Sequence, residues 1–233
     1  MIIVSPTELY DFLKSKGVEH RYFSSTVKNA CSMIRSKTLM SLRVLSLNKL
    51  PMSPVNNEAT YKQCCMWNKI PLYLYNLHGY FTRQNKNGPV CFKISIDFLT
   101  EINERDLHIS KRNPLNWKST LTKNDICYSS VDELSQRFDT LYDERKIHKT
   151  IILVRDKKSR IDLSKYLCEI SLDYLNDKHL LFQRSEKALN EALCESGLNN
   201  IPLKTLKCEN FCFCQANYSE MPKEELENLF LPK

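Results

Sequence analysis

The sequence predicts an α+β fold with a strand-rich centre, organised as one domain. Apolar residues recur at helical spacing near both ends of the chain, and two central segments alternate apolar and polar residues. No internal repeat or low-complexity linker divides the 233 residues, and the apolar share of 42% is enough to build a core. We therefore expect residues 1–233 to form a single domain, with residues 200–233 as a candidate C-terminal appendage.

The N-terminal elements have clear boundary signals. Ser5-Pro6-Thr7-Glu8 predicts a helix start, because it combines a Ser cap, a Pro at the first helical position and a Glu that completes a capping box. The helix is expected over residues 6–16, with Gly17 as its stop. Residues 18–24 look extended. The next helix is indicated by apolar residues at helical spacing: Val27, Ala30, Cys31 and Ile34.

The centre of the chain is expected to supply strands. Thr38–Leu47 alternates loosely and is interpreted as a strand, and residues 48–66, broken by two prolines, as a long polar loop. Ile70–Leu77 and Val90–Ile96 alternate with period two and predict two further strands. The turn between them is dense in polar and aromatic side chains.

The C-terminal half mixes both types of element. Residues 162–175 are ambiguous between helix and strand. The other elements expected here are a helix over about 130–145, a buried strand over Thr150–Val154, a strand near 179–182, a helix over Ser185–Ser196 stopped by Gly197, a strand-like alternation near 206–214 and an acidic helix around 222–230.

Composition excludes several classes. The chain has four glycines, no two closer than nine residues, so it lacks the glycine-rich phosphate cradles of Rossmann and P-loop proteins. The N-terminus has no basic region before its short apolar stretch, and no apolar run is long enough to span a bilayer. We therefore expect a cytoplasmic protein whose ten cysteines serve mostly as buried apolar residues. The net charge of +7 is a mild bias toward polyanionic partners.

The cysteine spacing does not favour a metal site. Cys208, Cys212 and Cys214 are spaced C-x3-C-x-C and Cys64-Cys65 are adjacent, but no pair of C-x2-C motifs recurs. The alternation of Phe211, Cys212, Phe213 and Cys214 favours two faces of a strand. A zinc-stabilised interaction domain is the less favoured alternative.

Two ordered segments carry a family resemblance. Tyr22, Ser25, Asn29, Ser32, Met33-Ile34 and Leu39 fall on the pattern Y-H-x-T-x-x-x-N-L-x-S-I-L-x-x-G-L-L of ADP-ribosyltransferases of the DarT type, with Ser25 in place of Thr. Ile70–Leu74 resembles the V-P-F-Y-F strand that follows in that family. Thr150–Val154, followed by Ile161, Leu163, Tyr166 and Ile170, resembles its E-x-L-V strand and the next element. The matches keep family order over most of residues 20–182.

The resemblance implies a split β-sheet core with peripheral helices and transfer of ADP-ribose from NAD to a base of RNA or DNA. It extends to toxins of phage-defence systems, so an antitoxin is an expected partner. The family's motif histidine falls on Phe23 and its glutamate on or next to Thr150, so another residue would supply the acid. The replacement candidates are Glu144, Asp156, Asp162 and Glu169, although Glu144 lies in a charged run that also fits a solvated surface.

The chemistry of NAD cleavage indicates the remaining candidates. It needs a polar strand end for the nicotinamide amide, an aromatic group for the ring and an acid or base. Ser25 fits the first, and Tyr73, Tyr75 or Tyr80 the second. Each tyrosine also fits strand packing, and Tyr73 and Tyr75 would share one side of a strand.

His78 and Arg83 lie in a turn where they would meet a pyrophosphate or a nucleic-acid phosphate. The expected site is therefore His78, Asp162 and Glu144 for catalysis and Tyr22, Ser25, Asn29, Tyr73, Tyr75 and Arg83 for NAD, with no metal. His78 equally fits a turn histidine without a ligand, and Asn29 a helix-surface residue.

A different class of function remains open. A catalytically inactive relative would act as a nucleic-acid or protein binding module. Lys111-Arg112, Lys118 and Lys123, interleaved with Trp117, form a basic stretch that fits either a single-stranded nucleic acid or an exposed loop.

Overall fold

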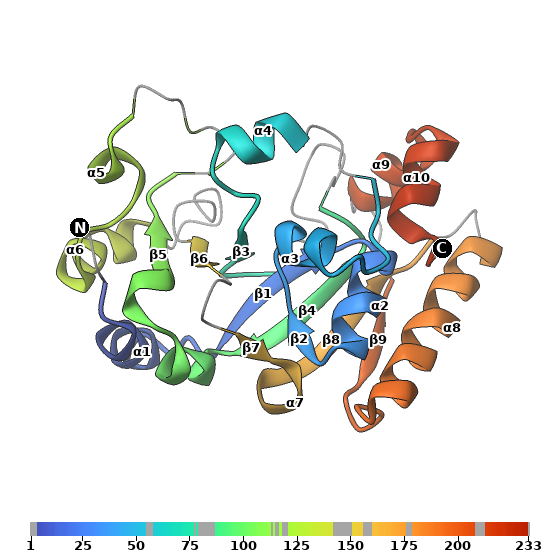
Figure 1. The fold of residues 1–233 in the computed structure, drawn as a ribbon, viewed down its shortest axis with the longest axis horizontal. Coiled ribbons are helices and arrows are strands. Elements are labelled where there is room, and N and C mark those ends of the chain that lie inside the picture. The colour runs from blue at the N-terminus through green and yellow to red at the C-terminus, as the bar shows by residue number, and fades with distance from the viewer. Residues whose placement is uncertain are drawn as a thin grey trace.

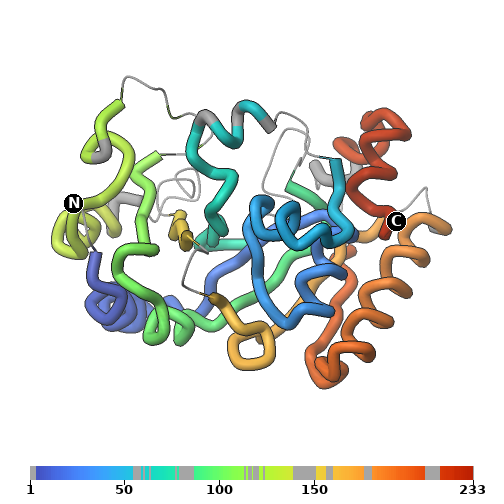
Figure 2. The backbone as a smooth tube through the Cα atoms, in the orientation of Figure 1, coloured from blue at the N-terminus to red at the C-terminus, as the bar shows by residue number. Residues whose placement is uncertain are grey.

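The computed structural model describes residues 4–54, 58–76, 78, 87–112, 114, 117, 121–141, 151–155, 160–175, 179–207 and 213–232. Figure 1 shows two larger β-sheets in the middle of the molecule, with helices at both sides, and a third sheet consists of two short strands, Thr38–Leu39 and Ile161–Asp162. The N-terminal helix lies at the left with α6, and the C-terminal helices lie at the right (Figure 2).

The chain begins with the three elements that the sequence predicts. Helix α1 (Pro6–Ser15) starts at Ser5, whose hydroxyl accepts a hydrogen bond from the Glu8 amide at 3.3 Å. Strand β1 (His20–Ser25) follows, with Arg21, Phe23 and Ser25 buried and the alternate residues half-exposed. Helix α2 (Val27–Arg35) is capped by Thr26. These predictions are confirmed.

The first sheet has the order β1-β4-β8-β9. Its other strands are β4 (Val90–Ser95), β8 (Leu167–Asp173) and β9 (Leu203–Leu206). β4 runs antiparallel to β1 and to β8, and β9 runs parallel to β8. Each strand alternates its side chains between the two faces, so one face is mostly apolar, with Arg21 and Ser25 of β1 buried among its residues, and the other is more polar.

The second sheet has the order β3-β6-β5, all antiparallel. It consists of β3 (Lys69–Leu72), β6 (Ile151–Arg155) and β5 (Leu107–Ser110). It meets the first sheet at a bridge between Tyr22 and Tyr73, whose backbone groups exchange hydrogen bonds of 2.9 and 2.7 Å. β1 and β3 part on either side of this bridge, which gives the split-sheet core implied by the family resemblance.

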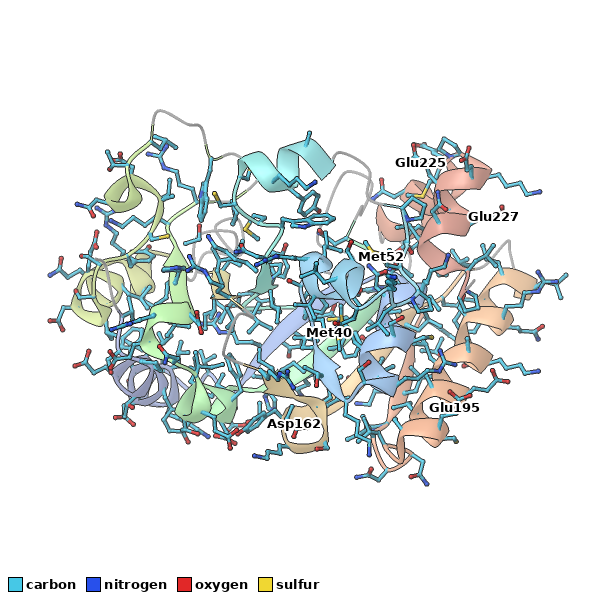
Figure 3. The ribbon with its side chains drawn as sticks, viewed as in Figure 1. Met40, Met52, Asp162, Glu195, Glu225 and Glu227 are labelled. Atoms are coloured by element: carbon cyan, nitrogen blue, oxygen red, sulfur yellow. The ribbon has the colours of Figure 1, made fainter. Side chains whose placement is uncertain are left out.

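Three helices pack together on the apolar face of the first sheet. They are α2, α8 (His179–Ser196) and α10 (Lys223–Phe230). Their buried residues share one hydrophobic core with Phe92 and Ile170 of the sheet. Arg35 of α2 pairs with Glu195 of α8 at 2.5 Å, and Figure 3 shows Glu195 on the side of α8 toward the lower edge.

The remaining elements surround the two sheets. Helix α6 (Val131–Leu141) packs near α1 through an edge-to-face contact of Phe12 and Phe138. The short elements are β2 (Thr38–Leu39), α3 (Leu42–Leu47), α4 (Glu58–Gln63), η1 (Ile96–Glu101), η2 (Glu104–Asp106), α5 (Lys123–Ile126), β7 (Ile161–Asp162), α7 (Leu163–Tyr166) and α9 (Phe213–Ser219).

Two predictions about residues 38–66 are wrong in part. The strand expected over Thr38–Leu47 ends at Leu39, because Ser41 caps a helix by accepting a hydrogen bond from the Val44 amide at 3.3 Å. The loop expected over 48–66 contains α4, whose sequence EATYKQ is rich in good helix formers.

Three predictions in the C-terminal half also change. The strand expected near 179–182 is the first turn of α8, whose buried positions Phe182, Ser185 and Leu189 recur at helical spacing. The alternation near 206–214 is wrong for Phe213 and Cys214, which begin α9, whereas β9 ends at Leu206. The ambiguous residues 162–175 contain both types, α7 and then β8, because Asp162 caps a single helical turn.

The strand expected over Ile70–Leu77 is shorter and ends at Leu72, and the helix expected over about 130–145 is described as far as Leu141. Strand β4, strand β6, helix α10 and the end of α8 before Gly197 lie where the sequence places them. Within the described ranges, no helix is long and apolar enough to cross a membrane.

Candidate active site

The site is built where three strand ends of the first sheet meet. Ser25, the last residue of β1, pairs with Val90, the first residue of β4. The amide of Asp173, at the end of β8, donates to the Pro89 carbonyl at 3.0 Å. Gly88 has a φ of +110° and lies against the Ser25–Thr26 peptide so closely that a Cβ would be 2.2 Å from the Ser25 carbonyl oxygen. Only glycine fits there without displacing the end of β1.

Asp173 is the centre of a buried polar cluster. Its side chain is 5% exposed, and its Oδ1 lies 2.5 Å from Nδ1 of His78. The Tyr218 hydroxyl of α9 donates to Oδ2 at 2.5 Å, so both carboxylate oxygens have partners. Burial and the Asp173 charge raise the pKa of the neighbouring Cys91 thiol to about 12, which keeps that thiol protonated. Hence Asp173 joins a loop histidine and a C-terminal tyrosine at the end of β8.

This arrangement determines what His78 can do. When Nδ1 donates to a carboxylate, the proton of a neutral imidazole is fixed on Nδ1 and Nε2 becomes the proton acceptor. A buried aspartate that holds a histidine in this tautomer also stabilises the imidazolium that forms when a proton arrives. His78 is therefore equipped as a general base, with Asp173 as the group that orients it.

A polar surface extends from this cluster along the first sheet. Tyr22 and Ser24 of β1 are half-exposed on the face opposite Phe23. Partial burial, and then the nearby Cys91 and Glu169, raises the Tyr22 pKa. The strand register places Tyr22 opposite Lys93, whose partner on β8 is Glu169. Glu169 pairs with Lys204 of β9 at 2.6 Å. One face of the sheet thus carries a hydroxyl, a phenol and charged groups beside the His78 cluster.

Where β1 separates from β3, the C-terminal end of β1 faces the second sheet. Because the backbone of Tyr22 bonds toward Tyr73, the alternation of an antiparallel strand turns the Ser24 amide and carbonyl in the same direction. In this antiparallel arrangement β3 runs back past Ser24, but among the described residues the Tyr22–Tyr73 bridge is the one backbone pairing between β1 and β3. The backbone of Ser24 is therefore placed to bind an amide group at the split.

Two predicted NAD-binding residues have structural contacts. Ser25 is 4% exposed on the apolar face, so the serine on the polar face is Ser24. Asn29 is 6% exposed, and its Oδ1 accepts a hydrogen bond from the Ser53 amide at 2.8 Å. Ser53 Oγ lies 2.9 Å from the Asn228 carbonyl, so this contact ties α2 to α10.

The sequence analysis expected the two tyrosines after β3 to share one side of a strand, but they pack against different hydrophobic clusters. Tyr73 packs on a small hydrophobic cluster with Ile151 and Leu153, and burial, then Tyr61, raises its pKa. Tyr75 packs on the main core. The period-two rule fails here because the strand ends at Leu72 and the backbone bends at residues 74 and 75.

Asp162, one of the predicted acids, has a structural contact away from the His78 cluster. Asp162 caps α7, with Oδ1 accepting from the Ser164 amide at 2.8 Å, and Figure 3 shows it at the lower edge of the molecule. Asp162 lies before the start of β8 and Asp173 at its end, and the seven-residue strand between them is about 20 Å long. Glu144, Arg83, Tyr80, Asp156 and Thr150 lie outside the described residues.

Sequence reasoning missed Asp173 and Tyr218. Asp173 lies in the segment that was ambiguous between helix and strand, and Tyr218 follows a segment interpreted as a strand. An aspartate directly after an apolar alternation was the available signal, because polar residues at strand ends often carry function. Nothing in the spacing pairs it with a histidine 95 residues earlier.

Among the residues that the structure describes, no three His, Cys, Asp or Glu side chains are grouped so that they would hold a metal. Cys208 and Cys212 lie outside the described residues, and Cys64 is buried.

No protein-family model matches the chain, and no curated protein matches it. The chain is similar to the solved structure of Thermus sp. 2.9 DarT in complex with ADP-ribosylated ssDNA, with a TM-score of 0.52 and 12% identity over 82% of this chain and 95% of that one. The same DarT in complex with NAD+ matches at 14% identity and a TM-score of 0.46, and in complex with carba-NAD+ at 12% and 0.48; each match covers 82% of this chain and 96% of the other.

The first of these similarities defines the fold. The chain has a DarT-like ADP-ribosyltransferase fold, a mixed α+β architecture with a split sheet, as the sequence resemblance implied.

Proposed function

We propose that this protein is an NAD-dependent ADP-ribosyltransferase that modifies a base of RNA or DNA. The observation that carries the proposal is the His78–Asp173–Tyr218 cluster at the open end of a DarT-like split sheet. The similar DarT structures contain NAD+ and ADP-ribosylated ssDNA, and the net charge of +7 favours a nucleic-acid acceptor. We further propose that it acts in the cytoplasm as a toxin or phage-defence effector restrained by an antitoxin.

The residues fit the chemistry of the reaction. The bond between nicotinamide and the ribose C1′ breaks through an oxocarbenium-like state, and nicotinamide leaves with the bonding electrons. A ring or exocyclic nitrogen of the acceptor base forms the new bond to C1′ and passes its proton to Nε2 of His78. Asp173 stabilises the resulting imidazolium.

NAD binding is assigned to the split. The Ser24 backbone would bind the nicotinamide amide, and the Tyr22 ring beside it would lie against the nicotinamide or ribose. These residues replace Ser25 and Asn29 in that role, because the latter two side chains are buried in structural contacts. Tyr73, Tyr75 and Arg83 remain candidates for the rest of NAD, and Glu144 for a further acid.

We propose that residues 1–233 form one domain that includes the C-terminal segment. β9 pairs with β8, Ser185 Oγ donates to the Phe230 carbonyl at 2.6 Å, and Tyr218 contributes directly to the site. Residues 200–233 would then complete the active site and would not be a separable appendage.

A second candidate function is a catalytically inactive binding module. One observation favours it: Phe23, at the position of the family's motif histidine, is 7% exposed and packs on Phe92 with ring centroids 6.0 Å apart. That position serves the core in this chain. The active enzyme therefore depends on His78 as its base.

The two candidates are separated by incubating the purified protein with radiolabelled NAD and, in separate arms, single-stranded DNA, RNA or cellular protein. We expect label on one nucleic acid, and His78→Ala should lower labelling at least ~100-fold, the usual contribution of a general base. His20→Ala is the matched control, because His20 lies at the other end of β1, about 17 Å from Ser25, and should label normally. Absence of label in every arm, without release of nicotinamide, would overturn the enzyme proposal.

A further inference from the structure

A cationic cluster lies on the second sheet, away from the His78 cluster. Lys69 of β3 and Arg155 of β6 are direct cross-strand partners, so their side chains leave the same face of the sheet. Like charges placed opposite each other in a sheet repel. Lys69 is nevertheless only 8% exposed, which is unusual for a lysine.

Trp117 completes this cluster. The Lys69 ammonium lies 4.9 Å from the centroid of the Trp117 ring, a cation–π distance. The Trp117 backbone is held in place: its amide donates to the Pro114 carbonyl at 3.1 Å, and Cys64 Sγ donates to its carbonyl at 3.9 Å. The indole also packs against the small hydrophobic cluster that contains Ile151 and Leu153.

This cluster contains two N–H groups that no acceptor of the described residues binds. Trp117 Nε1 and Arg155 Nε are buried, and neither has a hydrogen-bond partner among the residues that the structure describes. Over the same ranges, Arg155 forms no ion pair with a carboxylate. By contrast, Lys111, which follows the end of β5, is paired with Glu133.

We infer that Lys69, Arg155 and Trp117 form a binding site for a backbone phosphate of the single-stranded nucleic acid. A phosphate oxygen would accept hydrogen bonds from guanidinium and indole donors, and its charge would offset the repulsion between the two cations. A face of the indole ring would also offer a surface on which a base stacks. The assignment of this phosphate to a nucleic acid rests on the proposed function.

The position favours nucleic acid over NAD. Lys69 is four residues before Tyr73, so the cluster lies about 13 Å along β3 from the bridge where the sheets split. An acceptor strand whose target base reaches the split would span that distance with a few nucleotides. The site would therefore position the strand and not the reacting groups.

The chain offers a direct reporter for this site. It has two tryptophans, Trp67 and Trp117, so Trp67→Phe leaves Trp117 as the sole fluorophore. Oligonucleotides of ~12 thymidines or ~12 uridines are titrated into this variant, and NAD alone is titrated in a parallel arm. We expect a saturable change in Trp117 emission with an oligonucleotide and none with NAD.

Arg155→Gln, in the same background, should weaken oligonucleotide binding several-fold at ~50 mM salt. The slope of log K against log salt should fall by about 0.7 for the lost phosphate contact. Arg184→Gln is the matched control: it removes the same charge from an exposed position on α8 and should leave the slope unchanged. Thermal melting of each variant checks that the fold is retained.

Three results would overturn the inference. Trp117 emission could stay unchanged while the protein binds an oligonucleotide, or NAD alone could produce the change. Arg155→Gln and Arg184→Gln could also give equal slopes of log K against log salt. None of these readouts uses catalysis. A protein that binds through Trp117 without labelling nucleic acid would contradict the proposed function and leave this site standing, and the reverse result would do the opposite.

Discussion

Replacing Gly88 with alanine tests the contact that closes the end of the first sheet. A Cβ at this position would lie 2.2 Å from the Ser25 carbonyl oxygen, 2.3 Å from its carbon and 2.5 Å from the Thr26 nitrogen. Ordinary contact begins near 3.4 Å, so the ends of β1 and β4 would have to separate by about 1 Å. All three atoms belong to the backbone, which has no flexible side chain to move aside.

The cost has two sources. A φ of +110° strains any residue with a Cβ by roughly 1–3 kcal/mol, and forcing a methyl group into a packed region adds roughly 1–3 kcal/mol. We expect Gly88→Ala to lower the free energy of unfolding by about 3 kcal/mol, with a fall in Tm of about 6–12 °C for a chain of this size.

Gly197→Ala is the matched control for scanning calorimetry. Gly197 also has a positive φ, +69°, but a Cβ there meets nothing within 4 Å. Its substitution should cost about 1 kcal/mol from backbone strain alone. If Gly88→Ala melts within about 2 °C of Gly197→Ala, the close approach of the two strand ends does not contribute to stability, and the reasoning is refuted.

Three further substitutions test individual contacts. Burial alone would raise the pKa of Glu133, but hydrogen bonds, chiefly from Lys111, lower it to about 2, so its stabilisation is full above pH ~4.5 and is lost as pH falls toward 2. In urea titrations between pH 4.5 and 2, the free energy of unfolding of Glu133→Gln should therefore fall by about 1 kcal/mol less than that of the wild type. Equal falls in the two proteins would contradict this. Ser5→Ala removes the cap of α1 and should cost about 1 kcal/mol in the same assay at pH 7, where an unchanged midpoint would show that the cap is dispensable. Tyr218→Phe removes a hydrogen bond to buried Asp173 and should cost about 1.5–3 kcal/mol, whereas wild-type stability would mean that the carboxylate does not need this donor.

Elements with both a boundary signal and a long periodic pattern were predictable. Helix α1 has a cap, a first-turn proline and a stop glycine, and β4 alternates over six residues. Where a boundary signal lies inside an apolar run, the sequence was misleading. Ser41 starts α3 within a predicted strand, and α8 begins six residues before its most obvious helical start.

The candidate site was predictable in part. His78 was singled out from its turn, and Tyr22 from the family pattern, because both lie in segments with local signals. Asp173 and Tyr218 were not, since they approach His78 only after β8 joins the first sheet and α9 packs over its end. Hydrogen bonds between residues 45 and 95 positions apart leave no local spacing in a sequence.

The sequence by itself determined the fold class, the exclusion of a glycine-rich phosphate cradle and the segments that resemble DarT-type enzymes, because each depends on residues close together in the chain. The tertiary structure alone decided which side chains form a site. The split at Tyr22 and Tyr73, the carboxylate that orients His78 and the pairing of Lys69 with Arg155 all arise from strand register. Register is set by which faces are buried across the whole sheet, and no single segment contains that information.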